Sequence, residues 1–305
     1  MKASLIPVLV SISLFLPACF SFTPPAITGK KLDPAAISRL FGSPVGFDET
    51  TGVVKLILPR SDLNVIIDGV RVTPALGLKA RATLTGTTEQ AILLGDLPLL
   101  QSEVDPVLQA AIEAGLEVTA LHNTFLLDNP RVMSLHITGK GTQENLAKAA
   151  GTVFKKLSEK IPAPREKETA PLLDPARSTL DLQTMEALLW KGQQTEGVFR
   201  VSLGRGTQLN GEDVGEAEGI NSWAAFAGTP EHAVANGDIA TLESELRPLL
   251  QTLIRAHIHV VSIHTHLTRE VPKLVFVHFW GTGPVKELAA GVKTAIQLKE
   301  EFQSQ

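Results

Sequence analysis

The chain has 305 residues, of which 44% are hydrophobic and 20% are charged, and its formal net charge is -4. This composition excludes a disordered or collagen-like chain, and the length predicts about two domains. A single cysteine excludes a disulfide scaffold, and the lack of a basic excess argues against a nucleic-acid partner.

Residues 1–18 are typical of an export signal. Lys2 provides a positive start, and Leu5 to Leu16 form an apolar run shorter than the roughly 20 residues of a membrane span. The only cysteine, Cys19, follows this segment directly. We therefore expect export, with the chain either anchored to the membrane by a lipid on Cys19 or soluble in the periplasm or outside the cell.

The rest of the chain is a duplication. Gly69 to Ala147 align without a gap with Gly211 to Ala289. Residues repeated in this alignment include Gly95/Gly237, Asp96/Asp238, Glu103/Glu245, His122/His264 and His136/His278. We infer two copies of one unit, repeat 1 at 35–157 and repeat 2 at 181–302, joined by a proline-punctuated linker at 158–180.

In chain order, each repeat alternates between strand and helix periods. Repeat 1 predicts strands at 53–58, 63–67, 78–85 and 90–97, a helix at 102–114, strands at 118–126 and 132–138 around a turn at 128–131, and a helix at 145–157. Repeat 2 follows the same order, with helices near 243–256 and 285–302. This order predicts an α+β fold with a strand–helix–strand–strand–helix core. Each repeat places its helices on one face of an antiparallel sheet, and a pseudo-two-fold axis relates the two repeats.

Several short motifs carry a family resemblance. They are Pro59-Arg60-Ser61-Asp62-Leu63, Asp68-Gly69-Val70, Pro74-Ala75-Leu76-Gly77, Gly95-Asp96-Leu97 and Val118-Thr119-Ala120-Leu121-His122-Asn123. With the lipobox-like Cys19, they make the chain resemble the LppY/LpqO-type family of bacterial lipoproteins, a duplicated domain of unknown function. The family tends to carry His-x-His, which repeat 2 keeps as His264-Thr265-His266 and repeat 1 lacks. The resemblance thus implies an envelope protein whose complete site is in repeat 2.

The histidines of repeat 2 form the candidate site. His264 and His266 share one face of a strand, and a hairpin centred on Val271 would place His278 opposite His264. Three converging imidazoles predict a site for zinc or another divalent transition metal, with His122 and His136 as a partial counterpart in repeat 1. Two alternatives remain open. The histidines could be hydrogen-bonded sheet residues, or they could act as acid/base or ligand-binding groups without a metal.

Carboxylates are the second candidate group. Glu212, Asp213, Glu216 and Glu218 form either a solvated acidic loop or a source of a ligand or general base over the histidine face. For Asp96 and Asp238 we expect a turn or hydrogen-bonding role.

Three functions therefore stand at this point. The chain could be an envelope protein that binds a metal ion or small ligand, a metal-dependent hydrolase or lyase using the same histidines, or a structural envelope protein without a site. The residues indicate no substrate and do not decide whether the protein is an enzyme.

Overall fold

The computed structural model describes residues 29–159 and 172–301. The predicted signal at 1–18, the predicted lipidation residue Cys19 and positions 160–171 of the predicted linker lie outside the described residues.

Repeat 1 contains three α-helices and nine strands. They are α1 Pro34–Phe41, β1 Gly46–Asp48, β2 Val53–Pro59, β3 Val65–Ile67, β4 Val70–Val72, β5 Lys79–Gly86, β6 Ala91–Leu100, α2 Val104–Glu113, β7 Glu117–Asn123, β8 Asp128–Asn129, β9 Val132–Gly141 and α3 Gln143–Ser158.

Repeat 2 has the same order of elements. They are α4 Leu182–Leu188, β10 Gln193–Thr195, β11 Val198–Gly204, β12 Thr207–Leu209, β13 Glu212–Val214, β14 Asn221–Gly228, β15 Ala233–Leu242, α5 Glu243–Arg255, β16 His259–His264, β17 Glu270–Val271, β18 Leu274–Gly283 and α6 Val285–Glu301. Short 3-10 turns at Gln101–Glu103 and Pro175–Arg177 precede α2 and α4.

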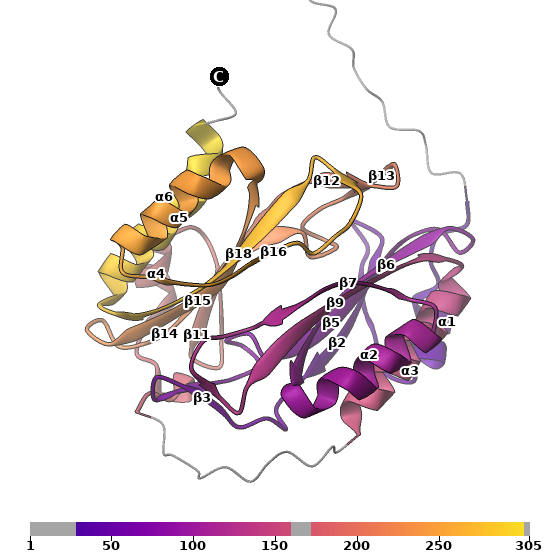
Figure 1. Cartoon of the computed structure of the whole chain (residues 1–305), viewed down its shortest axis with the longest axis horizontal. Helices are drawn as coiled ribbons and strands as arrows, with labels where there is room; N and C mark the ends of the chain where they lie inside the picture. Colours follow the sequence, from indigo (N-terminus) through magenta and orange to yellow (C-terminus); the bar gives the residue numbers. More distant parts are fainter. Residues whose placement is uncertain (1–28, 160–171, 302–305) are drawn as a thin grey trace, which may run out of the picture.

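Each repeat builds one six-stranded antiparallel sheet. The strand orders β1-β2-β5-β6-β9-β7 and β10-β11-β14-β15-β18-β16 give every strand equivalent neighbours in the two sheets. Figure 1 shows the sheets facing each other across the middle of the molecule, with α1, α2 and α3 outside one sheet and α4, α5 and α6 outside the other. The predicted α+β class, with two related repeats and helices on one face of each antiparallel sheet, is confirmed.

Both faces of each sheet are covered, which explains why the central strands are apolar throughout. On β6, Leu93 and Leu97 pack against the helices of repeat 1. The alternate residues Ile92 and Leu94 point to the other face and pack against residues of repeat 2. Because side chains alternate along a strand, one segment supplies both layers.

Two small three-stranded sheets tie the repeats together. In the sheet of β4, β3 and β8, Val65 and Ile67 pack with Trp223 and Trp280 of repeat 2. In the sheet of β13, β12 and β17, Leu209 packs with the inner face of β6. Each repeat therefore covers part of the inner face of the other, and the space between the main sheets is an interior.

The pairing of β16 with β18 departs from the predicted hairpin. The chain leaves the main sheet after β16 and contributes β17 to a small sheet, and a bulge between Val260 and Ser262 shifts the register. As a result His278 lies opposite Ser262, and His264 lies opposite Phe276. The predicted opposition of His264 and His278 is therefore wrong. Because the shift amounts to two residues, both histidines still face the same side of the sheet.

Within the described parts of the chain, no helix combines the length and apolar character needed to cross a membrane.

Candidate functional site

Five histidines meet between the two main sheets. His122 on β7 and His136 on β9 come from repeat 1, whereas His264 on β16, His266 just beyond it and His278 on β18 come from repeat 2. Two sets of three histidines have ring nitrogens within 4.8 Å of one another: His122, His264 and His278, and His136, His264 and His266. Each set draws on both repeats. The candidate site is therefore a composite one, and not a patch of repeat 2 alone; we call these five residues the histidine cluster.

The rings of the cluster are in direct contact. His122 Nε2 lies 2.9 Å from His136 Nε2, and His264 Nε2 lies 3.0 Å from His266 Nε2. Between the repeats, the rings of His122 and His264 stack with centroids 3.7 Å apart. The ring of His278 stacks on His264 with a centroid separation of 5.2 Å.

Backbone carbonyls orient two of the rings. His278 Nδ1 lies 3.2 Å from the carbonyl oxygen of Gly237, and His122 Nδ1 lies 2.9 Å from that of Asn123. A carbonyl oxygen only accepts, so Nδ1 is the donor in both rings, and a neutral ring then has a bare lone pair on Nε2. Metal-binding histidines are commonly held by such a bond on their other nitrogen.

One aspartate faces the cluster from each sheet. Asp96 on β6 lies directly opposite His136 on β9, and Asp238 on β15 lies directly opposite His278 on β18. Both aspartates are in the middle of long strands, so a turn role is wrong for them, whereas the alternative hydrogen-bonding role is confirmed for Asp96. The sequence contained a signal for this placement, because a carboxylate recurs at one position of an otherwise apolar predicted strand.

The glycine before each aspartate is required by packing on the other face of the strand. A Cβ at Gly95 would meet Cγ1 of Ile137 at 2.7 Å. At Gly237 a Cβ would collide with the ring of Phe279. The Gly-Asp pairs thus combine close packing on the helix side with a carboxylate on the inner side.

The carboxylate of repeat 2 is surrounded by histidine nitrogens. Asp238 Oδ2 lies 3.2 Å from His266 Nε2, 3.7 Å from His264 Nε2 and 3.8 Å from His278 Nε2. The other oxygen, Oδ1, is buried and has no hydrogen-bond partner among the described residues. A buried, unpartnered carboxylate oxygen is costly unless a further group binds it.

The carboxylate of repeat 1 has different neighbours. Ser134 Oγ donates to Asp96 Oδ1 at 2.6 Å, and Arg81 Nη2 lies 3.4 Å from Oδ2. The aligned positions of repeat 2 hold Phe276 in place of the serine and Trp223 in place of the arginine. These two replacements leave the repeat 2 carboxylate to the histidines.

Burial sets the protonation states of the cluster. Desolvation lowers the pKa of His122 to about 4, and the charge of His278 acts in the same direction. It also lowers the pKa of His136 and of His264. Burial by itself would raise the pKa of Asp238, but the facing histidines hold it well below its usual range. At neutral pH His122, His136 and His264 are therefore neutral imidazoles beside an ionised carboxylate, the forms that bind metal ions.

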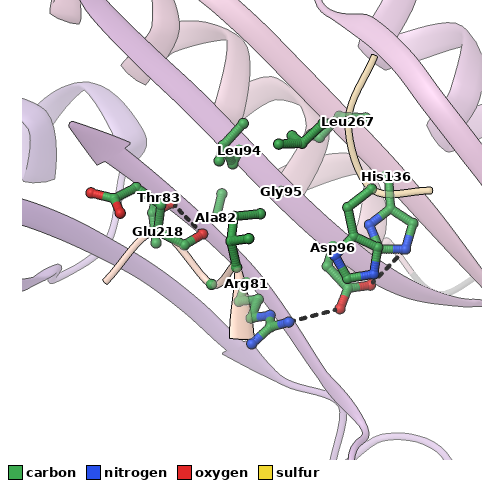
Figure 2. A pocket seen from close by; sticks show the side chains of 13 residues that line it. Arg81, Ala82, Thr83, Leu94, Gly95, Asp96, His136, Glu218 and Leu267 are labelled. Atoms are coloured by element: carbon green, nitrogen blue, oxygen red, sulfur yellow. Dashed lines mark hydrogen bonds and ion pairs between the residues drawn. The ribbon is translucent and has the colours of Figure 1, made fainter. Parts of the chain in front are cut away.

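A small cavity of about 30 Å³ reaches the cluster from repeat 1, and Arg81, Asp96, His136 and His266 are among its lining residues. Figure 2 shows Asp96 between Arg81 on one side and His136 on the other. This volume is enough for about one water molecule or ion. A wider cleft of about 390 Å³ adjoins it and shares Arg81 and Asp96.

The acidic loop approaches the cluster at one residue, because Glu218 lines the small cavity beside His136 and His266. Among the described residues it supplies no carboxylate within 4.0 Å of a histidine. Glu212 and Asp213 are exposed on β13, and Glu218 accepts the N–H of Gly215 at 2.8 Å.

Comparison with known proteins gives a family without an assigned activity. The model of the family described as a Domain of Unknown Function (DUF1259) matches residues 35–156 and 183–298. The comparison with curated proteins gave no match. Among solved structures, the crystal structure of a trimeric bacterial microcompartment shell protein PduB covers 85% of this chain and 93% of its own. Its sequence identity is 10% and its TM-score 0.21, too low to support an argument. The chain belongs to the DUF1259 family, and both of its repeats match that domain.

Proposed function

We propose that the protein binds one divalent transition metal ion, such as zinc, in the histidine cluster. The observation that carries this proposal is the position of Asp238. Its Oδ2 lies 3.2, 3.7 and 3.8 Å from three histidine Nε2 atoms, while its Oδ1 is buried and has no hydrogen-bond partner in the described part of the chain. His264 belongs to both sets of converging histidines and is therefore the central imidazole.

The donor set and its spacing suit such an ion. Neutral imidazole with one carboxylate is a ligand combination used for zinc and for other first-row metals. Ligands at 2.0–2.2 Å from a tetrahedral metal are roughly 3.3–3.6 Å apart. The separations of Asp238 from the three rings bracket that range. Each set of converging histidines adds a ring of repeat 1, so the ion would also need His122 or His136 as a ligand.

Export and lipid attachment are part of this proposal. They are supported by the signal-like residues 1–18, by Cys19 directly after them and by the resemblance to LppY/LpqO-type lipoproteins. In this proposal the membrane is a partner through the lipid on Cys19, and the metal site acts in the cell envelope.

A metal-dependent hydrolase or lyase is the second candidate. The cavity beside His136 and His266 favours it, because a substrate group could approach a bound metal there. A metal would polarise that group or activate water. Asp96 lines the same cavity and is a candidate carboxylate for proton transfer.

Elemental analysis of the purified full chain, after zinc loading and desalting, tests the metal site. We expect about one zinc per chain in the unmodified protein and at least a tenfold lower content in His264→Ala. His259→Ala is the matched control, because His259 is an exposed residue of the same strand and should leave the content unchanged. Equal zinc in His264→Ala and His259→Ala would overturn the proposal and favour a structural role for the histidines.

A further inference from the structure

The wider cleft beside the histidine cluster is lined by basic side chains. It has a volume of about 390 Å³ and includes Lys79 and Arg81 of β5 and Arg200 of β11. We call these three residues the cationic cleft. Repeat 1 supplies Lys79 and Arg81, and repeat 2 supplies Arg200, so the cleft, like the histidine cluster, is shared by both copies. Lys55 of repeat 1 also lines the cleft but is paired with Asp48 at 3.3 Å.

The cleft lies on the pseudo-two-fold axis of the duplication. The alignment of the repeats pairs Lys79 with Asn221 and Arg81 with Trp223, and all four residues line the same cleft. The two copies have therefore diverged at equivalent positions of one pocket. Repeat 1 keeps positive charges, and repeat 2 contributes an amide and an indole.

Two of the three cations form no ion pair with another described residue. Arg81 lies 3.4 Å from Asp96. Within residues 29–159 and 172–297, neither Lys79 nor Arg200 has a carboxylate oxygen within 4.0 Å, although Glu216 lines the cleft. Arg200 instead lies over the indole of Trp223, with Cζ 3.9 Å from the ring centroid.

These cations oppose one another in a partly desolvated space. Burial lowers the pKa of Arg200 to about 9, and the neighbouring Arg81 acts in the same direction. Burial, and then the charges of Arg200 and Arg81, lower the pKa of Lys79. A bound anion would offset the unfavourable effects of burial and of like-charge repulsion, because an opposite charge stabilises the charged form of each group.

Asn221 adds an unpartnered polar group to the same cleft. Its side chain is only 8% exposed, and its Oδ1 has no hydrogen-bond partner among the described residues. Buried amides in folded proteins are normally hydrogen-bonded, so this oxygen has an acceptor position that an ordered water or a bound group would fill. An amide both donates and accepts, which suits a hydroxyl group or an oxyanion.

We propose that the cationic cleft binds a small organic oxyanion, either a phosphate ester or a carboxylate, through Lys79, Arg81 and Arg200, with Asn221 as a neutral partner. Arg81 also contacts Asp96, which faces His136, so the bound anion lies next to the histidine cluster (Figure 2). The binding site goes beyond the proposed metal site and does not depend on it, because none of its side chains is a metal ligand in that proposal. If a metal is also bound, the two sites together would position an anionic substrate beside it.

Titration calorimetry on the full chain tests this proposal with two probes, phenyl phosphate and benzoate, first in EDTA and then with zinc. We expect saturable binding of at least one probe in EDTA, at least tenfold weaker in Arg200→Gln and in Lys79→Gln. Lys273→Gln is the control, because this exposed lysine lies outside the cleft and should bind like the unmodified protein. Tighter phenyl phosphate would identify a phosphate ester as the ligand class, and tighter benzoate a carboxylate.

Absence of binding of both probes to the unmodified chain, or unchanged binding by the cleft variants, would overturn the proposal. If Arg200→Gln loses its fold by circular dichroism, Lys79→Gln decides the outcome. A chain that holds no zinc but binds a probe through Lys79 would disprove the metal site and leave the cationic cleft standing.

Discussion

The two repeats share a scaffold and differ in the groups around one carboxylate. Asp96 and Asp238 occupy equivalent strands opposite equivalent histidines. Asp96 is hydrogen-bonded by Ser134 and contacts Arg81, whereas Asp238 has histidine nitrogens near one oxygen and, among the described residues, no hydrogen-bond partner on the other. The repeat 1 carboxylate is therefore hydrogen-bonded within the protein, and one oxygen of the repeat 2 carboxylate is not.

The difference shows that a duplicated fold can build one site from two copies whose side chains have diverged. Close packing on the helix side fixes the backbone at both Gly-Asp pairs. Substitutions at neighbouring residues that face the other sheet therefore change the groups around the carboxylate without changing the sheet. Phe276 and Trp223 in repeat 2 remove polar partners that repeat 1 keeps, and His266 adds an imidazole where repeat 1 has Thr124.

The buried ion pairs of the two repeats should differ in strength. Arg60 donates to both oxygens of Glu103 at 2.8 and 3.0 Å and also to the carbonyl of Pro98 at 2.8 Å. Arg205 binds Glu245 through Nη2 alone, and its Nη1 has no partner among the described residues. We expect Arg60→Ala to lower the free energy of unfolding by about 3–5 kcal/mol, because it strands a buried carboxylate. Arg205→Ala should cost less. Urea denaturation checks both, and equal losses would contradict the comparison.

Acid should destabilise the metal-free protein through its buried histidines. The pKa of His122 is about 4 in the folded state, below its ordinary value of 6.5. Between these values the unfolded chain binds more protons, so stability falls as pH is lowered through this window. The shift corresponds to on the order of 3 kcal/mol for this residue. Denaturation in EDTA at pH 7, 5.5 and 4 measures the slope. His122→Gln should make the slope shallower, and an unchanged slope would show that His122 is not a buried neutral ring.

The two aspartates should respond differently to neutralisation. Asp238→Asn replaces a proposed ligand and should weaken zinc binding at least about 100-fold, the upper end of what losing a supporting group costs. Asp96→Asn should weaken it less than tenfold, because Asp96 is satisfied by Ser134 and Arg81. Competition of each variant with a zinc chelator gives the affinities. Equal losses of zinc affinity in the two variants would mean that Asp96 and Asp238 contribute equally to zinc binding.

Adding a methyl group at Gly95 and at Gly237 should lower the stability of the protein by different amounts. A Cβ at Gly237 meets the backbone oxygen of Trp223 as well as the Phe279 ring, whereas at Gly95 the nearest atoms are the flexible ends of Ile137. We expect Gly237→Ala to cost roughly 1–3 kcal/mol of stability and Gly95→Ala to cost less. Thermal unfolding of the two variants is the measurement, and the reverse order would show that the sheets adjust more easily than this packing indicates.

Much of the fold could be predicted from the sequence, because the duplication and the strand and helix periods are local signals. The helix at Gln143–Ser158 and the strand at Ala91–Leu100 agree with predictions at 145–157 and 90–97 to within a few residues. The register of His278 could not be predicted, since a bulge at Val261 and the excursion of β17 depend on contacts with the small sheet. Strand periodicity correctly indicated that His264 and His278 face one side of the sheet, whereas His266 lies beyond the end of β16 and was wrongly expected on the same strand.

The composite nature of the site was beyond the sequence. Nothing in the spacing of either repeat says that β7 and β16 lie beside each other across the axis, which brings His122 onto His264. The cationic cleft was missed for the same reason, because Arg81 and Arg200 lie far apart in the chain and meet only when the sheets face each other. Asp96 and Asp238 could have been found, since charge in a buried strand needs a partner.

The most direct test of the composite site is the zinc content of a variant altered only in repeat 1. His122→Ala/His136→Ala leaves every histidine of repeat 2 in place. Circular dichroism of this variant is the control for correct folding. We predict that this double variant loses at least nine-tenths of its bound zinc, as His264→Ala does, because each converging set includes a histidine of repeat 1. Retention of one zinc per chain would contradict the account and place the whole site in repeat 2.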